Sequence, residues 1–223
     1  MTVNTNFRFD ELKRRHRAER DDQHGNLSLR VHRALSWLKR AEMADDADGQ
    51  FIFLWVAFNA AYGNEIDGEQ GRTQQQAFLQ FLKKLQELDE KGLLNSLVWQ
   101  EFTGSIRVLL DNRYVFASFW EWQKGNLDEA TWQERFRKGK ADANHALASQ
   151  DAANVLAIVL RRTYVLRNQL VHGGATWNSQ INRPQVKDCV QLLGKLVPTV
   201  LEIMMNHPDT LWGDASYPVV KSA

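Results

Sequence analysis

The sequence has little of what several protein classes require. A single cysteine, Cys189, among 223 residues excludes an intramolecular disulfide framework and a zinc site built from several cysteines, and it is typical of a reducing compartment. Four prolines and 13 glycines, without a low-complexity tract, argue against a disordered or fibrous chain. The first residues lack the basic and apolar segments of a secretory signal. We therefore expect a folded cytoplasmic protein.

Long hydrophobic runs are also missing. The most apolar stretch covers residues 51–62, and it is shorter than the roughly 20 residues that a membrane-spanning helix needs. Because this stretch is apolar on all sides, it is typical of a helix enclosed by other helices. We expect no membrane contact, and the hydrophobic residues, 43% of the chain, suffice for a sizeable core.

An excess of one charge is absent over the whole chain but present within segments. The formal net charge of +1 excludes a strongly basic, histone-like nucleic-acid binder. Residues 1–40 nevertheless carry ten basic and five acidic side chains, whereas residues 41–112 carry five basic and 12 acidic side chains. Any affinity for nucleic acid is therefore expected from local patches.

Alternating apolar patterns of β-strands are nearly absent, and apolar residues recur at intervals of three and four. The sequence predicts an all-α protein, a helical bundle with extra helices. We divide it into a basic N-terminal arm of residues 1–26, a single α-helical domain of residues 27–206 and an irregular tail of residues 207–223. The expected helices of the domain cover residues 27–44, 51–62, 73–92, 93–111, 126–148, 151–172 and 184–206.

Polar side chains gather near the end of the expected helix 151–172. On a helical wheel with Arg167 at 0°, Asn168, His172 and Arg161 fall at about 100°, 140° and 120°. The residues that a bundle would bury fall nearly opposite: Val155, Leu156, Val159, Thr163, Leu166 and Leu170. Two interpretations stay open. The polar group forms a site at an interface, or it is a solvated helix end where His172 interacts with the helix dipole.

The segment 167–172, with Arg167, Asn168 and His172, resembles the Arg-x4-His signature of the HEPN superfamily. The context is similar as well, because the signature ends a long helix, a further helix follows, and an apolar helix with Phe58-Asn59 lies upstream. This context resembles the ApeA-like group of HEPN domains. The resemblance implies an all-α homodimer in which two motif helices form one composite cleft.

In the ribonucleases of this superfamily, cleavage is metal-independent and proceeds through attack of the ribose 2′-hydroxyl. By this resemblance His172 would exchange a proton, since free imidazole has a pKa of about 6.5. Arg167 would bind the phosphate, and Asn168 would orient the phosphate or the imidazole. Tyr164 is expected to support the site. Asn59 either supports the site as well or forms a structural hydrogen bond between helices, because an amide in an apolar helix needs hydrogen-bond partners. Toxin-type members often have a nucleotidyltransferase-like antitoxin, which is the partner expected here besides a second copy and RNA.

A ribonuclease also needs a surface that holds RNA. The expected helix 27–44 carries a stripe of three arginines and one tryptophan, namely Arg30, Arg33, Trp37 and Arg40. Together with Arg161, these side chains could neutralise phosphates and stack on unpaired bases. In the alternative interpretation, arginine stems cover Trp37 on a solvated helix.

These patterns leave three functions open. The leading hypothesis is a HEPN-type metal-independent endoribonuclease acting as a toxin or a defence effector. The alternatives are a non-catalytic HEPN module that binds RNA, a nucleotide or a protein partner, and a purely structural helical interaction protein. Motifs of serine hydrolases, phosphate-binding loops and zinc proteases are absent from the sequence, and we expect neither a cofactor nor a metal site.

Overall fold

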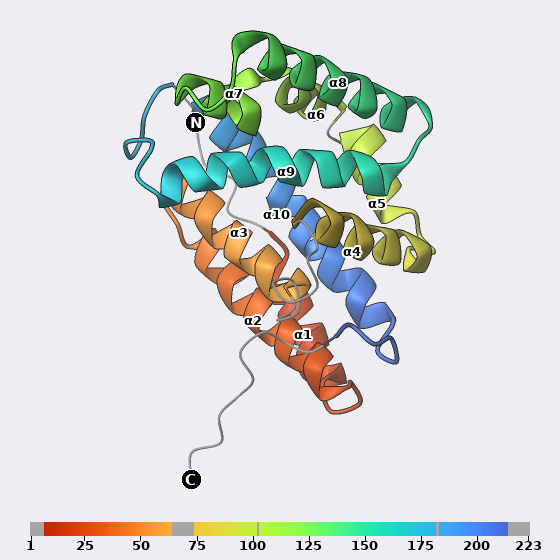
Figure 1. Cartoon of the computed structure of the whole chain (residues 1–223). Coiled ribbons are helices and arrows are strands. Elements are labelled where there is room, and N and C mark those ends of the chain that lie inside the picture. The colour runs from red at the N-terminus through yellow and green to blue at the C-terminus, as the bar shows by residue number, and fades with distance from the viewer. Residues whose placement is uncertain (1–6, 64–73, 102, 182, 214–223) are drawn as a thin grey trace. The chain divides into compact units, whose positions relative to one another are not determined.

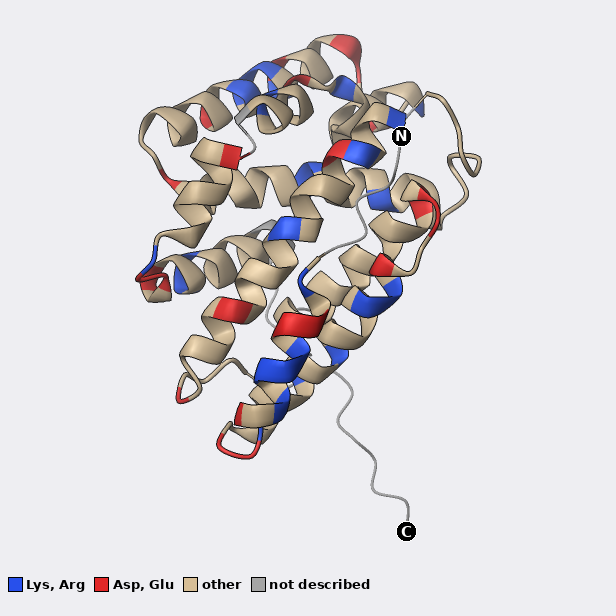
Figure 2. Cartoon of the chain, turned by 180° about the vertical axis from the view of Figure 1, so that it is seen from behind, with Lys and Arg blue, Asp and Glu red and all other residues tan. Residues whose placement is uncertain are grey.

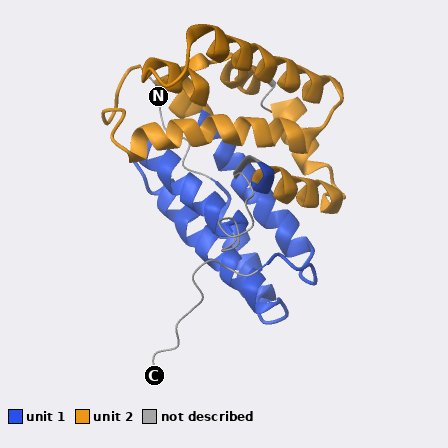
Figure 3. Cartoon of the chain, in the orientation of Figure 1, with its two compact units in different colours: residues 1–77, 189–223 blue, residues 78–188 orange. Residues whose placement is uncertain are grey.

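The computed structural model describes residues 7–63, 74–101, 103–181 and 183–213, and in these segments all regular structure is helical (Figure 1). The predicted all-α class is therefore confirmed. The chain forms two compact units (Figure 3). Unit 1 consists of residues 1–77 and 189–223, and unit 2 consists of residues 78–188. None of the helices in the described segments is both long and apolar enough to cross a membrane.

Unit 1 is built around a pair of helices that follow each other in the chain. Its elements are α1 (Phe9–Glu19), α2 (Gly25–Glu42), α3 (Ala47–Tyr62) and most of α10 (Arg183–Asn206). α3 packs along α2, and α1 also packs against α2. The apolar residues on one face of α2 are all buried, namely Leu27, Val31, Ala34, Leu35, Leu38 and Ala41. Asp46 caps α3 by accepting a hydrogen bond from the Gly49 amide at 2.8 Å.

The N-terminal segment differs from the expected arm. Residues Phe9–Glu19 form α1, in which Phe9, Leu12 and His16 are buried. Phe7 is buried as well, and its ring lies 2.5 Å from where a Cβ atom on Gly194 would be. Only a glycine at this position of α10 leaves room for that ring. The helix is difficult to recognise in the sequence because its buried face is short and includes a histidine.

Unit 2 contains the remaining helices. They are most of α4 (Gln74–Leu88), α5 (Leu93–Ser96), α6 (Thr103–Asp111), α7 (Ala117–Gln123), α8 (Glu129–Ala148) and α9 (Ala152–Val171). The expected helix 93–111 is divided, because a π-helical turn, Leu97–Glu101, separates α5 from α6. Asp128 caps α8 by accepting a hydrogen bond from the Thr131 amide at 2.8 Å. Of the expected tail, residues 207–213 are described and are not helical.

An aromatic cluster fills the space between α7 and α8. Phe119 and Trp132 are buried there, and Trp122 stacks on Trp132 with ring centroids 5.3 Å apart and an interplanar angle of 20°. Phe116 makes an edge-on contact with Phe136 of α8 at 5.2 Å. Because large aromatic side chains bury much apolar area, this cluster holds α7 and the chain before it in place. The same cluster forms one wall of a pocket described below.

Candidate active site

α9 carries the Arg-x4-His motif at its C-terminal end. It contacts α5, α6 and α8 of unit 2, and α6 and α8 lie along it in Figure 1. The face that the sequence predicted to be buried is buried in the structure for Val155, Leu156, Val159, Thr163 and Leu166, whereas Leu170 is half-buried. Asp151 begins the helix by accepting a hydrogen bond from the Asn154 amide at 3.0 Å. This packing determines which side chains of the motif face outward.

The helix ends at the motif histidine. His172 is the C-cap residue of α9, and its amide donates to the Asn168 carbonyl at 3.0 Å. Gly173 follows with a φ of +70°, a left-handed conformation that favours glycine and stops the helix. The His172 side chain is exposed. The sequence His-Gly-Gly therefore places an imidazole at the open end of the helix.

Arg167 and Asn168 form a linked pair one turn before this end. Nη1 of Arg167 donates a hydrogen bond to Oδ1 of Asn168 at 3.0 Å. The Arg167 guanidinium carbon also lies 6.0 Å from the centroid of the Tyr164 ring, the outer limit of a cation–π contact. All three side chains are half-buried. Among the described residues, the guanidinium thus contacts an amide and an aromatic ring, and it forms no ion pair with a carboxylate.

Gln169, which the sequence analysis did not single out, anchors the end of α9. Its Nε2 donates to the Tyr114 carbonyl at 2.8 Å, and Trp120 Nε1 donates to the same oxygen at 2.7 Å. Tyr114 belongs to the 3₁₀ turn Arg113–Val115, which also contacts α9. Nothing in the spacing of the motif points to this contact, because it joins residues 55 positions apart.

The polar face expected to be open is covered in its first half. α6 and α8 pack against α9 there, so Ile158 is buried and Arg161 is half-buried. Arg161, Arg162 and Val165 of α9 line a pocket of about 280 Å³, which α8 and residues 115–118 complete. Arg161 therefore lies in a pocket, and among the three predicted polar residues of this face His172 is the exposed one.

Arg162 is a second residue that the sequence analysis missed. On the helical wheel it falls at about 220°, next to the face that the bundle buries. Its side chain is 1% exposed, although an arginine usually covers solvent-facing surface. An arginine beside the predicted buried face is a feature by which the sequence alone could have pointed to Arg162.

The expected RNA-binding stripe on α2 needs one correction. Arg30 is 1% exposed, and its Nη1 donates to the Ala61 carbonyl of α3 at 3.0 Å, so Arg30 belongs to the interior of unit 1. Arg33 is half-buried, while Trp37 and Arg40 are exposed. Trp37 stacks on Phe53 with centroids 5.9 Å apart, and the Arg40 guanidinium carbon lies 4.3 Å from the Phe53 centroid. Without Arg30, the exposed part of the stripe consists of Trp37 and Arg40, with Arg33 half-buried beside them in the sequence.

The excess of basic residues at the N-terminus is partly balanced by carboxylates. Arg8 forms ion pairs with Glu11 and Glu202, and Arg15 pairs with Glu19. In Figure 2 the positions of basic and acidic residues are interspersed along the helix ribbons. Asn59 of α3 is half-buried, and its proposed supporting role stays a prediction.

Exposed apolar side chains lie at the end of the motif and in the ten residues that follow it. Val171, Trp177 and Ile181 are 48%, 74% and 80% exposed, respectively. Large apolar side chains that are left exposed within a short stretch of chain make this stretch a candidate protein contact site. We call these three residues the apolar patch.

Comparisons with models of protein families, with curated proteins and with solved structures found no match to this chain. Within the described segments, no three His, Cys, Asp or Glu side chains are grouped so that they could hold a metal ion.

Proposed function

We propose that the protein is a metal-independent endoribonuclease of HEPN type that cuts RNA at a composite site formed by two copies of the chain. One observation carries the proposal. α9 ends with an exposed imidazole, His172, one turn after a guanidinium that is held by the neighbouring amide. This is the set of groups that the resemblance of the motif assigns to RNA cleavage.

The chemistry follows from the properties of these groups. The ribose 2′-oxygen attacks the adjacent phosphorus, and the 5′-oxygen of the next nucleotide leaves. The products are a 2′,3′-cyclic phosphate and a 5′-hydroxyl. A neutral His172 accepts the proton of the 2′-hydroxyl, and the protonated His172 of a second copy donates a proton to the leaving oxygen. Arg167 binds the phosphate oxygens and stabilises the negative charge that develops on them.

The arrangement of Arg167 supports this role. Its partner within α9 is the Asn168 side chain, a neutral amide oxygen. A neutral acceptor orients the guanidinium without cancelling its charge, so the attraction for a phosphate is retained. The remaining N–H groups can then form the bidentate contact that arginine makes with phosphate.

The apolar patch supports a second copy as the partner. One chain supplies a single His172, whereas the reaction needs both an acceptor and a donor of protons. The residues of the patch lie on both sides of His172 in the chain, between positions 171 and 181, so contact between two patches would bring two motif segments toward each other. A two-fold symmetric contact of this kind is the commonest form of self-association.

Cleavage in the presence of a chelator tests the proposal. Wild-type protein is expected to cut a single-stranded RNA in EDTA, while His172→Ala and Arg167→Ala lose at least about 100-fold in rate. His145→Ala serves as the matched control, because His145 is also exposed and lies in the last turn of α8. Equal rates for wild type and His172→Ala would contradict the proposal. RNA binding without cleavage would favour the non-catalytic HEPN module.

A further inference from the structure

The pocket beside α9 contains a buried cation, Arg162, for which the described part of the chain shows no ion pair. Arg162 is 1% exposed, and none of its three side-chain nitrogens has a hydrogen-bond partner within the described part of the chain. Its guanidinium carbon lies 4.2 Å from the Phe116 centroid and 5.6 Å from the Phe136 centroid. Aromatic faces attract the charge, but they do not replace the hydrogen bonds that the N–H groups make in water.

A buried guanidinium in this state destabilises the fold. Removing a charge from water is costly unless the charge is paired and its donors are satisfied. Methionine or leucine would fill the same space among Phe116, Phe136 and Gly139 without this cost. The presence of an arginine at position 162 is therefore better explained by a ligand that supplies the missing hydrogen-bond acceptors than by a contribution to stability.

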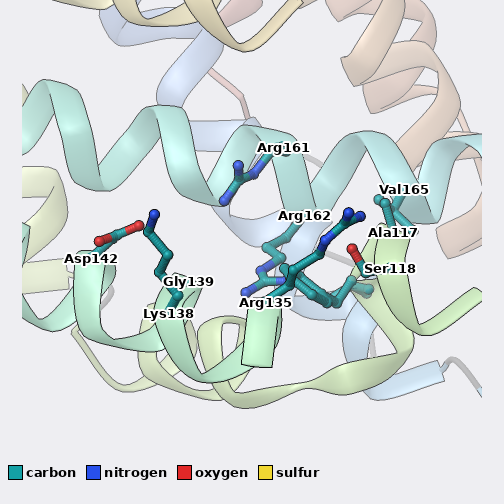
Figure 4. Close-up of a pocket in the computed structure, with 11 residues that line it drawn as sticks. Ala117, Ser118, Arg135, Lys138, Gly139, Asp142, Arg161, Arg162 and Val165 are labelled. Atoms are coloured by element: carbon teal, nitrogen blue, oxygen red, sulfur yellow. The ribbon is translucent and has the colours of Figure 1, made fainter. Parts of the chain in front are cut away.

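The other charged residues around the pocket are mostly basic. Arg161 of α9 and Arg135 and Lys138 of α8 line it with Arg162, and Asp142 is the single carboxylate among the lining residues (Figure 4). Burial, and to a smaller extent the charge of Arg161, lowers the pKa of Arg162 to about 9. Burial also lowers the pKa of Arg161, against the attraction of Asp142. The cations outnumber the carboxylate, which is the arrangement that attracts an anion.

The volume of the pocket limits the size of the anion that it can hold. A volume of about 280 Å³ lies close to the lower end of the roughly 300–1,000 Å³ of small-molecule sites. Several arginine N–H groups favour a ligand with several acceptor oxygens, and phosphate provides three with a charge near −2. A dianion matches the surplus of positive charge better than a carboxylate does. Phe116 gives the pocket an apolar wall for the carbon skeleton that carries the phosphate.

We propose that this pocket binds a phosphate monoester, whose oxygens accept hydrogen bonds from Arg162 and Arg161. The monoester belongs either to a free nucleotide or to the 5′ end of an RNA strand. The position of the pocket is compatible with both. Val165, which lines it, lies three residues before Asn168 on α9, and Arg161 precedes His172 by 11 residues, or about 16 Å of helix. The site is distinct from the motif, so its ligand binding does not depend on RNA cleavage.

Calorimetric titration of the full chain tests the proposal. The probes are inorganic phosphate, adenosine 5′-monophosphate and adenosine, followed by a short RNA with a 5′-phosphate and the same RNA with a 5′-hydroxyl. The two RNAs are titrated into His172→Ala, so that they are bound without being cut. Wild-type protein is expected to bind the monophosphate but not adenosine. A preference for the 5′-phosphorylated strand over the monophosphate identifies the strand end as the ligand, and the reverse order identifies a free nucleotide.

Two variants with a matched control locate the binding. Arg162→Met is expected to weaken binding of the monophosphate roughly 10- to 100-fold, the range for lost hydrogen bonds to a charged group. Arg135→Gln removes an exposed cation of the pocket and weakens binding without disturbing the interior. Arg137→Gln makes the same change of charge on α8 outside the lining, at a residue paired with Glu134, and leaves binding unchanged.

The outcomes separate this proposal from the cleavage mechanism. Arg167→Ala and His172→Ala are expected to retain wild-type binding of the monophosphate even if they no longer cut RNA. Absence of binding to every phosphorylated probe at millimolar concentration would overturn the proposal. So would equal affinity for adenosine and its monophosphate, or an equal loss of affinity in Arg137→Gln and Arg135→Gln.

Discussion

Nη1 of Arg167 donates a hydrogen bond to Oδ1 of Asn168, its neighbour in α9, at 3.0 Å. Adjacent helical residues diverge by about 100°, so the two side chains bend toward each other across the surface of the helix. The contact restricts the guanidinium to the side of α9 on which Asn168 lies. It turns Arg167 toward the wheel position of His172, which differs from that of Arg167 by about 140°.

The first prediction concerns Asn168 as a positioning residue. Asn168→Ala removes the acceptor and is expected to lower kcat for RNA cleavage about tenfold, the equivalent of one lost hydrogen bond, with a smaller change in KM. Single-turnover and steady-state cleavage rates measure this. Asn144→Ala, an exposed asparagine of α8, is the control. A KM effect without a kcat effect would assign Asn168 to substrate binding instead.

Self-association through the apolar patch is the second prediction. Wild-type protein is expected to be dimeric at micromolar concentration, and Trp177→Ser combined with Ile181→Ser shifts it to monomer, because two exposed apolar side chains are lost. Sedimentation velocity measures the mass of each form. The double variant should also lose RNA cleavage, since each site would lack its second His172. A wild-type protein that is monomeric at this concentration would contradict a composite site formed by two copies.

The third prediction concerns the stability of the anion pocket. Arg162→Met replaces a buried cation that has no hydrogen-bond partner in the described segments by an apolar side chain of similar length, and the free energy of unfolding is expected to rise by about 1–3 kcal/mol. Urea denaturation without phosphate measures it. Leu166→Ala, at a buried position one turn along α9, should instead lower it by about 2–5 kcal/mol. A loss of that size in Arg162→Met would show that the arginine supports the fold.

The fourth prediction is that stability falls in mild acid because of His16. Burial in unit 1, then the charge of Lys13, lowers the pKa of His16, and the charges of Arg20 and His32 act in the same direction. Its Nε2 lies 3.3 Å from Ser28 Oγ. The unfolded chain therefore binds a proton at His16 more readily than the folded chain does. The contribution of neutral His16 to the free energy of unfolding is fully present above its unfolded pKa of about 6.5, and it is lost as the pH falls below that value.

Urea denaturation at a series of pH values between about 7 and 5 measures the effect of this histidine. His16→Gln cannot be protonated, so its unfolding free energy is expected to change less over that interval than the wild-type value. An exposed histidine far along the chain, His145, provides the control substitution His145→Gln. Parallel curves for wild type and His16→Gln would contradict the assignment.

The sequence was sufficient to predict the helices that have a clear apolar period. α9 shows this well, because its buried residues recur at three and four and Asp151 and Gly173 mark its ends. α1 was missed although Phe9, Leu12 and His16 also recur at intervals of three and four, because its buried face has only these three side chains and one of them is a histidine. The π-helical turn after α5 has no pattern that distinguishes it from an α-helix.

The candidate site was predicted only in part, because the sequence reveals spacings within one helix but not contacts between distant segments. A spacing within one helix places Arg167, Asn168 and His172, and the structure shows how Arg167 and Asn168 are joined. Contacts between distant segments are not contained in a spacing. Gln169 meets the Tyr114 carbonyl, Arg30 is covered by α3, and Arg162 is enclosed by α8 and Phe116. Such enclosure depends on which faces other helices cover.

The central claim is that Arg167 and His172 cut RNA through its own 2′-hydroxyl. Analysis of the cleavage products in EDTA tests this claim most directly, using one RNA oligonucleotide and the same oligonucleotide with deoxyribose at its cleavage site. The account predicts that wild-type protein cuts the RNA to a 2′,3′-cyclic phosphate and a 5′-hydroxyl, that the deoxy site stays intact, and that His172→Ala cuts neither. Cleavage at the deoxy site, or cleavage of the RNA by His172→Ala at the wild-type rate, would contradict it.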